Sequence, residues 1–368
     1  MAQSFQLPKT HRVLRLISTE EPLQVQTSPT PQPGPGNAVV KVLAAGVISY
    51  SGDVYNGKRR YPFPKPFVPG STAIGRVVAM GPDATTLTPG QLVLLDCTIR
   101  GRDNASAIIL SGLVEGHNEA SRKLMHGEWR DSTYAEYTKF PLENCIPLNE
   151  EHLLGPSSAG GLGYCVEDLI HMGLDDIGLR PGETLIVAPA TGQFGRSAVC
   201  VALAMGAGRV IAMGRNEIAL ASLSALDNCV ITVKITGDEQ ADAETLKKLG
   251  PADAYFDISP HGAASSTHFQ SAIAALKHSG RVSLMGGPRG GVLFPYVDIM
   301  RRNLTLKGTW MYTRAQILSF VQLVDSGLLS LGEKGGVTIE GKFKLEQWKE
   351  AFEAASVAGP EKTVVIVP

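Results

Sequence analysis

Between Thr184 and Gly308 the chain alternates short apolar runs with segments of helical spacing, and this alternation constrains the fold more than any other feature. The apolar runs are TLIVAP (184–189), RVIAM (209–213), VITVK, AYFDI, RVSLM and LTLKG (304–308). Helical spacing is seen between them in RSAVCVALAMGA, NEIALASLSAL, ETLKKLG and HFQSAIAALKHSG. Strands that are apolar on both faces and alternate with helices predict an α/β fold with a doubly wound parallel sheet.

The first 150 residues lack this alternation. Short apolar runs at 37–47, 72–81, 91–97 and 133–140 are broken by Pro and Gly, which predicts a barrel or a sandwich of strands. Residues 97–129 are polar and show no clean period, as expected of a lid, a lobe or a disordered excursion. EHLLGPSSAGGLGYCVEDLIHM (151–172) has helical spacing with a glycine break.

Composition excludes several classes of protein. The 368 residues are 43% hydrophobic and carry a formal net charge of −1, so a disordered chain and a nucleic-acid-binding protein are both disfavoured. Only the cluster Lys58-Arg59-Arg60 favours nucleic acid, and it fits a solvated turn or the rim of a cofactor cleft better. No run approaches the roughly 18 apolar residues of a membrane span, and the N-terminal residues do not resemble a secretory signal. Five scattered cysteines favour a reducing compartment, so we expect a cytoplasmic protein.

A glycine-rich turn follows the first strand of the alternating region. Its residues are Thr191, Gly192, Gln193, Phe194 and Gly195, and a helix begins directly after it. Glycines let the backbone approach a pyrophosphate, and a helix N-terminus offers free N–H groups. The first glycine of the G-x-G-x-x-G pattern is replaced by alanine, so a plain turn before a packed helix is the alternative.

The end of the next strand indicates which nicotinamide cofactor is bound. About 20 residues after the glycine turn, an acid would bind the ribose 2′-hydroxyl of NAD, but Gly214 stands there and Arg215 follows. A guanidinium suits a 2′-phosphate, which predicts NADP(H), although Arg215 could instead only solvate a helix start. The predicted cofactor site consists of the turn residues together with Gly214, Arg215, Asn216, Ser259 and Gly286.

These stretches together resemble the medium-chain dehydrogenase/reductase superfamily over nearly the whole chain. The resemblance is carried by KVLAAGV, VPGSTAIGRVVAMG, YAEY, LRPGETLIVAPATGQFG and SGRVSLMGG, in that order. It implies a GroES-like β-barrel in residues 1–150, a Rossmann domain in 151–310 and a return to the first domain in 311–368. It also implies a homodimer that pairs through the strand near 304–308.

The zinc enzymes of this superfamily hold a catalytic metal with Cys, His and Cys. At the matching positions this sequence has Ile48, the triplet Gly70-Ser71-Thr72, and the segment 158–162, which contains no ligand residue; Cys165 comes a few positions late. Because a catalytic zinc site needs three protein ligands, the resemblance shifts to the zinc-independent branch of quinone oxidoreductases and enoyl reductases.

A structural zinc site is not expected either. It would need four clustered cysteines, and its region contains only Cys97. His117 and His126 lack partners at metal-ligand spacing and are expected on the surface. The sequence therefore predicts no metal.

Without a metal, a hydrogen-bond donor must stabilise the charge that develops on the substrate oxygen. Tyr50 stands two places after the lost ligand, where the zinc enzymes keep a relay hydroxyl, and Tyr61 matches a catalytic tyrosine of some enoyl reductases. Either tyrosine could instead be a packed aromatic residue whose hydroxyl is bonded locally. Asp53 could orient a hydroxyl, but a role in capping a turn is favoured.

We therefore expect an NADPH-dependent reductase of a small organic acceptor, with an activated C=C bond or a quinone favoured. A carbonyl reductase or alcohol dehydrogenase is the alternative within the enzymes. A non-catalytic NADPH-binding protein is the alternative from another class.

Overall fold

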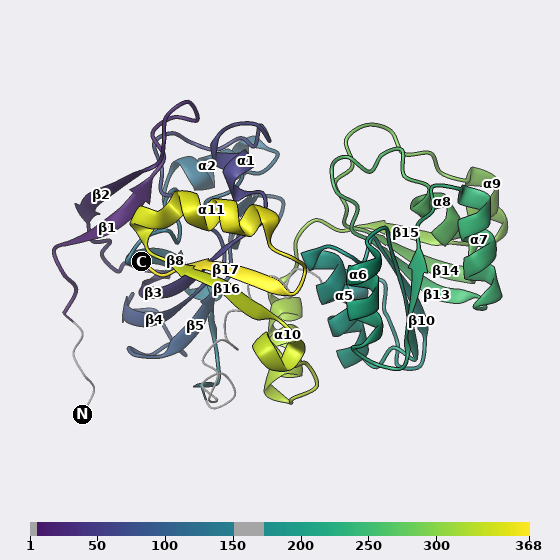
Figure 1. Cartoon of the computed structure of the whole chain (residues 1–368). Coiled ribbons are helices and arrows are strands. Elements are labelled where there is room, and N and C mark those ends of the chain that lie inside the picture. The colour runs from purple at the N-terminus through teal and green to yellow at the C-terminus, as the bar shows by residue number, and fades with distance from the viewer. Residues whose placement is uncertain (1–5, 151–172) are drawn as a thin grey trace. The chain divides into compact units, whose positions relative to one another are not determined.

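A computed structural model describes residues 6–150 and 173–368 (Figure 1). These residues form two compact units. Unit 1 contains the described residues up to 150 together with 331–358 and 362–368, and unit 2 contains 173–330 and 359–361. The helix expected within 151–172 lies outside the described residues.

Unit 1 is built on a seven-stranded sheet. Its strands are ordered β16-β17-β3-β4-β5-β9, and β8 pairs with β3 outside this path. The sheet strands are β3 (Asn37–Val47), β4 (Ala73–Met80), β5 (Leu92–Leu95), β8 (Tyr137–Pro141), β9 (Cys145–Pro147), β16 (Thr338–Phe343) and β17 (Lys362–Ile366). Two antiparallel hairpins accompany the sheet, β1 (Thr10–Arg15) with β2 (Gln24–Pro29) and β6 (Thr98–Arg100) with β7 (Ile108–Leu110). The helices of unit 1 are α1 (Ser51–Tyr55), α2 (Glu119–His126) and α11 (Trp348–Val357).

Aromatic side chains fill the core of unit 1. The ring of Tyr55 lies 5.7 Å from that of Phe352 on α11 and 6.4 Å from that of Tyr134, measured between centroids. The Tyr55 hydroxyl bonds the Gly112 carbonyl at 3.1 Å, so this buried phenol has its polar atom satisfied. Tyr55 therefore fixes the end of α1, directly after the segment that carries Tyr50.

The polar stretch 97–129 is an ordered part of unit 1 and not a disordered loop. It forms the β6–β7 hairpin and α2, whose N-cap Asn118 accepts a hydrogen bond from Ser121 N at 2.8 Å. Met125 of α2 is fully buried in the core of unit 1. The strand expected at 133–140 begins only at Tyr137, because Tyr134 bonds Pro69 and β1, and Glu136 N donates to Arg12 of β1.

Unit 2 contains the predicted doubly wound parallel sheet. Its strand order is β12-β11-β10-β13-β14-β15, and every neighbouring pair is parallel. The strands are β10 (Thr184–Ala188), β11 (Arg209–Gly214), β12 (Val230–Lys234), β13 (Ala252–Asp257), β14 (Leu276–Leu284) and β15 (Thr305–Gly308). The helices are α5 (Gln193–Ala204), α6 (Glu217–Ser224), α7 (Glu239–Lys248), α8 (His268–Ala274), α9 (Tyr296–Arg301) and α10 (Arg314–Asp325).

Two boundaries in unit 2 differ from the sequence expectation. The helix expected over 268–280 ends at Ala274, because Leu276 already pairs with Ala252 and β14 starts there. Helix α10 belongs to unit 2, whereas the return to the first domain was expected near residue 311. Its Gln316 donates to Asp175 at 3.0 Å and to Asp176 at 2.9 Å, so the chain enters unit 1 only at Leu331.

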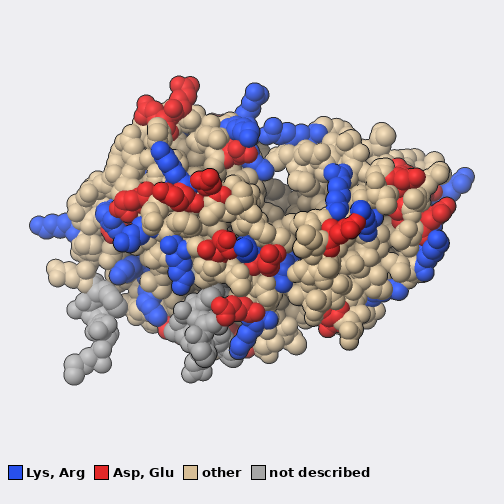
Figure 2. All heavy atoms as spheres, in the orientation of Figure 1, with Lys and Arg blue, Asp and Glu red and all other residues tan. Residues whose placement is uncertain are grey.

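Charge is mixed over the surface. On the face drawn in Figure 2, lysines and arginines alternate with acidic residues, and no broad field of one sign is visible. Over the described parts of the chain, every helix is too short or too polar to cross a membrane.

Candidate cofactor and active site

The turn after β10 is shaped to hold an anion. Gly192 is the N-cap of α5 in an extended conformation, and no side chain caps the helix there. A Cβ built on Gly192 would meet no heavy atom within 4 Å, and the first turn of α5 contains no acidic residue. The N–H groups and the positive end of the α5 dipole are therefore available to a phosphate.

Gly195 has the opposite environment. A Cβ there would lie 2.2 Å from the Pro189 carbonyl oxygen and 2.6 Å from Ala190 Cα. Only glycine lets α5 pack this closely on the turn that precedes it. Ala190, which replaces the first glycine of the pattern, has its methyl group fully buried, so an alanine is accommodated there.

The end of β11 offers no acid and one exposed cation. A Cβ on Gly214 would lie 2.2 Å from Thr191 Cγ2, so this position has no room for a side chain unless Thr191 moves. Arg215 is exposed, and its Nη2 donates to Ser266 Oγ at 3.2 Å. Asn216 caps α6 by accepting hydrogen bonds from Ile218 N and Ala219 N, which gives its side chain a structural role.

Ser259 and Gly286 lie beyond the carboxyl ends of β13 and β14. Ser259 Oγ donates to Asp257 Oδ1 at 2.6 Å, and Gly286 N donates to the Asp257 carbonyl at 3.1 Å. Strand β10 lies between β11 and β13, so the strand order reverses beside it. The predicted cofactor residues thus gather at the carboxyl edge of one sheet at its switch point, where open α/β sheets bind ligands.

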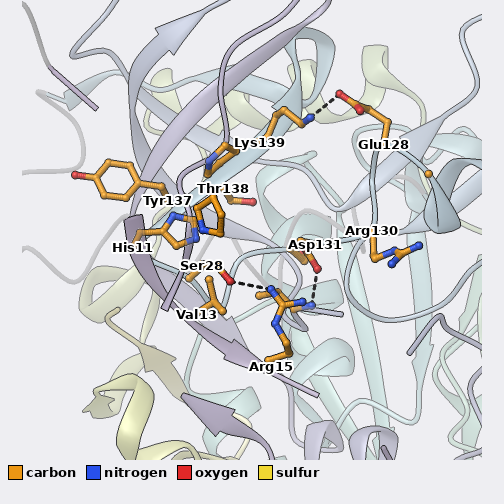
Figure 3. Close-up of a pocket in the computed structure, with 16 residues that line it drawn as sticks. His11, Val13, Arg15, Ser28, Glu128, Arg130, Asp131, Tyr137, Thr138 and Lys139 are labelled. Carbon is orange, nitrogen blue, oxygen red and sulfur yellow. Dashed lines mark hydrogen bonds and ion pairs between the residues drawn. The ribbon is translucent and has the colours of Figure 1, made fainter. Parts of the chain in front are cut away.

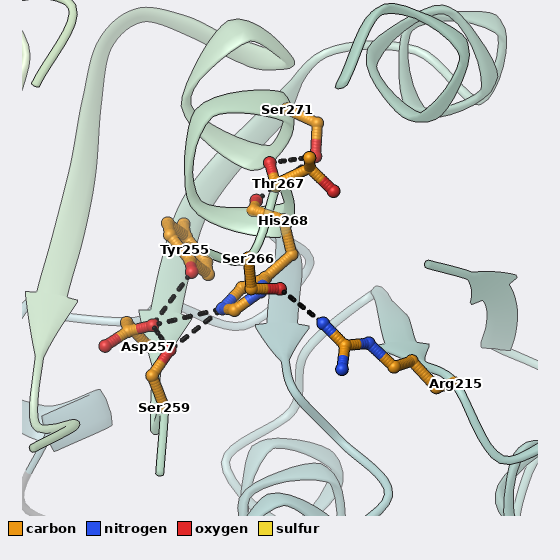
Figure 4. A network of polar contacts seen from close by, with 8 residues as sticks. All are labelled: Arg215, Tyr255, Asp257, Ser259, Ser266, Thr267, His268 and Ser271. Carbon is orange, nitrogen blue, oxygen red and sulfur yellow. Dashed lines mark hydrogen bonds and ion pairs between the residues drawn. The ribbon is translucent and has the colours of Figure 1, made fainter. Parts of the chain in front are cut away.

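Three residues of this edge were not predicted to be functional: Asp257, Ser266 and His268. Together with Ser259 and Arg215 they form a continuous series of polar contacts, shown in Figure 4 and called here the polar chain. Asp257 could have been noticed as an acid that ends a buried apolar strand. The other two give no signal in the sequence, because they lie in a loop and at a helix start.

Tyr50 and Tyr61 lie together in unit 1. Their ring centroids are 6.5 Å apart in an edge-to-face arrangement, and Arg59 Cζ lies 3.8 Å from the Tyr50 ring centroid. Both rings are half-buried against the core. Burial, with a smaller contribution from Tyr61, raises the pKa of Tyr50 above its ordinary value.

The hydroxyls of Tyr50 and Tyr61 have no hydrogen-bond partner within residues 6–150 and 173–368. The structural tyrosines differ, since Tyr55 bonds Gly112 and Tyr134 bonds the Gly46 carbonyl at 3.2 Å. The arrangement therefore leaves two phenol hydroxyls able to donate to another molecule.

In the basic cluster Lys58-Arg59-Arg60, the first two side chains contact neighbouring residues. Lys58 Nζ lies 3.3 Å from Asp53 Oδ1, and Arg59 stacks on Tyr50. Asp53 thus stabilises the turn after α1, as expected from the sequence.

The positions of the catalytic zinc ligands do not fit a metal where the structure describes them. Ile48 packs against the core of unit 1, and Ser71 N donates to Thr133 Oγ1 at 3.0 Å. The segment 158–162 and Cys165 lie outside the described residues. In the described remainder, no group of three or more His, Cys, Asp or Glu could hold a metal.

The other candidate metal ligands join no group of three or more such residues in the described chain. Cys97 is buried, whereas His117 and His126 are exposed, as expected. His126 Nε2 lies 2.7 Å from Glu115 Oε2, which gives this imidazole a single carboxylate partner.

Unit 1 also contains a cavity of about 380 Å³ (Figure 3), whose lining includes neither Tyr50 nor Tyr61. Its charged side chains are already engaged: Lys139 pairs with Glu128 at 2.6 Å, and Arg15 donates to Ser28 Oγ at 3.0 Å. His11 stacks on Tyr137, and burial lowers its pKa, which favours a neutral ring. The charged groups named here are thus paired, whereas the buried His11 Nδ1 has no hydrogen-bond partner in the described chain.

Comparison with known proteins agrees with this architecture. Residues 34–150 match the alcohol dehydrogenase GroES-like domain family, and residues 194–326 match the zinc-binding dehydrogenase family. The chain is 25% identical to an alcohol dehydrogenase of Rhizobium meliloti (83% of this chain, 86% of the relative). It is 24% identical to an L-threonine 3-dehydrogenase of Ruegeria pomeroyi (96% and 99%).

Solved structures show the same fold. A crystal structure of an NAD-dependent alcohol dehydrogenase superposes with a TM-score of 0.75 at 24% identity and covers 97% of this chain and 99% of that one. A protein of Sinorhizobium meliloti 1021, described as a zinc-binding dehydrogenase and solved with NADP bound, gives 0.74 at 20% identity, with 98% and 100% covered.

The chain belongs to the medium-chain dehydrogenase/reductase superfamily of NAD(P)-dependent oxidoreductases, with a GroES-like unit and a Rossmann-like unit. The expected fold class and the expectation of an enzyme are both confirmed.

Proposed function

We propose that this enzyme is a zinc-independent, NADPH-dependent reductase of a small organic acceptor, with an activated C=C bond or a quinone as its substrate class. The proposal is carried by two observations together: Ile48 stands at the position of a metal ligand, and Tyr50 and Tyr61, which pack against the same core, have hydroxyls without a hydrogen-bond partner in the described chain. A protein without a Lewis acid needs such donors for the oxygen that gains charge.

NADPH, when bound, supplies the hydride. The turn Thr191–Gly195 and the N-terminus of α5 would hold the pyrophosphate, and Arg215 would pair with the 2′-phosphate. Tyr50 donates a hydrogen bond to the acceptor oxygen, and Tyr61 stands beside it as the second donor. A phenol hydroxyl stabilises a negatively charged oxygen less strongly than a metal ion does. It therefore suits an acceptor whose charge is delocalised, as in an enolate or a hydroquinone, better than an isolated ketone.

Alcohol dehydrogenation, or carbonyl reduction in the reverse direction, is the second candidate. It is favoured by the names of the relatives, which are alcohol and L-threonine dehydrogenases. The experiment that separates the candidates measures NADPH consumption against matched enones, quinones, aldehydes and ketones, with identification of each product. Faster turnover of the saturated aldehydes and ketones would establish the second candidate in place of the first.

The choice of cofactor has its own test. Losing one charge-assisted contact to phosphate weakens binding by about ten- to a hundredfold, so Arg215→Ala should weaken NADPH binding by this factor and leave NADH binding nearly unchanged. Fluorescence titration of both cofactors measures the two affinities. Equal losses for both cofactors would contradict the role of Arg215.

A further inference from the structure

The polar chain runs from the surface of unit 2 into its core. Arg215 Nη2 donates to Ser266 Oγ at 3.2 Å, and Ser266 Oγ lies 2.6 Å from His268 Nδ1. His268 Nε2 lies 2.8 Å from Ser259 Oγ, which donates to Asp257 Oδ1 at 2.6 Å. Figure 4 shows these contacts in sequence, with Tyr255 donating to the same carboxylate oxygen at 3.0 Å.

The two ends of the polar chain fix the direction of the hydrogen bonds made there. An ionised carboxylate only accepts and a guanidinium only donates. Because Ser259 gives its proton to Asp257, its oxygen accepts from His268 Nε2–H. Ser266 Oγ accepts from Arg215 and lies within hydrogen-bond distance of His268 Nδ1, so Ser266 links the guanidinium to the imidazole.

The inner end of the polar chain is rigidly held. Asp257 is 4% exposed and His268 is 2% exposed, and Tyr255 is fully buried beside them. Burial and the adjacent carboxylate raise the pKa of Tyr255 well above its usual range, which keeps its phenol a donor to Asp257. The lack of a side chain at Gly286 leaves room for the Asp257 carboxylate, because a Cβ at this position would lie 2.5 Å from Asp257 Oδ2.

The outer end of the polar chain is a long exposed side chain with one anchored nitrogen. Ser266 is the only hydrogen-bond partner of Arg215 within residues 6–150 and 173–368. Its remaining N–H groups can therefore pair with a phosphate, and the contact with Ser266 removes part of the rotational freedom that such binding would otherwise cost.

We propose that Ser266 and His268 are positioning residues that hold the Arg215 guanidinium in place for the 2′-phosphate, so that cofactor selectivity depends on the polar chain as well as on Arg215. This inference rests on the proposed NADPH preference. It assigns a role to a buried histidine that makes no contact with the cofactor in the proposed reaction.

The test is a double-mutant cycle on the affinity for NADPH and NADH, measured by fluorescence titration of the full-length protein. Ser266→Ala removes the link and leaves the buried residues in place. It should weaken NADPH binding about three- to tenfold with NADH within about twofold, and Ser266→Thr, which keeps the hydroxyl, should restore most of the loss. Ser265→Ala is the matched control at an exposed neighbouring serine and should change neither affinity.

In an Arg215→Ala background, Ser266→Ala should have no further effect on NADPH affinity, because there is no guanidinium left to position. A loss in that background as large as in wild type, or equal losses for NADPH and NADH, would overturn the positioning role. If Arg215→Ala itself leaves the ratio of the two affinities unchanged, the proposed NADPH preference has failed instead, and the role of Ser266 and His268 fails with it.

Discussion

Hydroxyl groups decide the candidate chemistry at the scale of single residues. Four of the tyrosines of unit 1 divide into two pairs: the hydroxyls of Tyr55 and Tyr134 bond backbone carbonyls, while those of Tyr50 and Tyr61 have no hydrogen-bond partner in the described chain. Both pairs were equally visible in the sequence, but their hydrogen-bond state depends on the surrounding fold. Sequence reasoning could therefore name Tyr50 and Tyr61 as candidates without excluding that they were packed core aromatics.

Tyr50→Phe should lower turnover by about 10²- to 10⁴-fold, the usual contribution of one general acid, and leave NADPH affinity within about twofold. Steady-state kinetics and cofactor titration measure the two quantities. Because the pKa of Tyr50 is raised, the phenol keeps its proton to higher pH than a free tyrosine would. The rate ratio between wild type and variant should therefore be constant from about pH 6 to about pH 9.

Tyr61→Phe is the paired control at the neighbouring phenol. A large loss in Tyr61→Phe with near-normal turnover in Tyr50→Phe would transfer the role to Tyr61. Full turnover in both variants would contradict a tyrosine donor altogether.

The polar chain could not be predicted from the sequence, because it depends on contacts between distant segments. Ser266 and His268 contact Arg215 and Ser259 across separations of 51 and 9 residues, and a loop without periodicity sets those contacts. The cofactor turn was predictable, because its chemistry is determined by a strand, two glycines and a helix that are consecutive in the chain.

At the scale of elements, the parallel strands of unit 2 were the most predictable part of the fold. Strands β10, β11 and β13 are buried on both faces, so their sequences are continuous apolar runs. The hairpin of β1 and β2 was missed, since β2 is mostly half-exposed and shows no apolar run. Helix α8 was predicted too long, because the register of Leu276 with Ala252 is a tertiary contact that local propensity does not reveal.

The two glycines of the cofactor turn should respond differently to the same substitution. Gly195→Ala places a methyl group against the Pro189 carbonyl and should lower the free energy of unfolding by about 1–3 kcal/mol. Gly192→Ala meets no neighbouring atom and should change it by less than about 1 kcal/mol. Denaturant unfolding measures both values.

Gly192→Ala should nevertheless weaken NADPH binding by about tenfold or more, since its methyl group would occupy the space that a phosphate approaches. A Gly192→Ala variant with normal affinity would show that the pyrophosphate does not approach this turn.

At the scale of the whole molecule, unit 2 has an apolar edge suited to a second copy of the chain. Strand β15 is the outermost strand of its sheet, and exposed apolar side chains precede it: Leu293 is 83%, Tyr296 77% and Met300 55% exposed. Pairing of β15 across a two-fold axis would cover both features.

We therefore predict a homodimer, and sedimentation velocity at micromolar concentration should show a species of twice 39.1 kDa. Tyr296→Glu combined with Met300→Glu should convert it to monomer. Ile218→Glu is the matched control, because Ile218 is 85% exposed on α6, which packs on the strands at the opposite edge of the sheet. A wild-type protein that sediments as a single 39.1 kDa species would contradict the prediction.

Metal content is the second property of the whole molecule that can be measured directly. Because Ile48 and Ser71 provide no catalytic zinc ligand of the kind the superfamily uses, the purified enzyme should contain well under one zinc per chain and keep its turnover in chelator. Elemental analysis and assays with and without chelator measure this. One bound zinc per chain would move the enzyme to the metal-dependent branch.

The position of β17 has a consequence for the synthesis of the protein. Strand β17 lies between β16 and β3, and its Val364, Val365 and Ile366 are almost fully buried. The ribosome makes β3 first and β16 and β17 only after nearly all of unit 2, so the N-terminal strands leave the exit tunnel with the β17-pairing edge of β3 open. Unit 2 can complete its own sheet during that interval, whereas the edge of β3 in the nascent unit 1 stays unpaired and open to wrong pairing until the last residues of the chain are made.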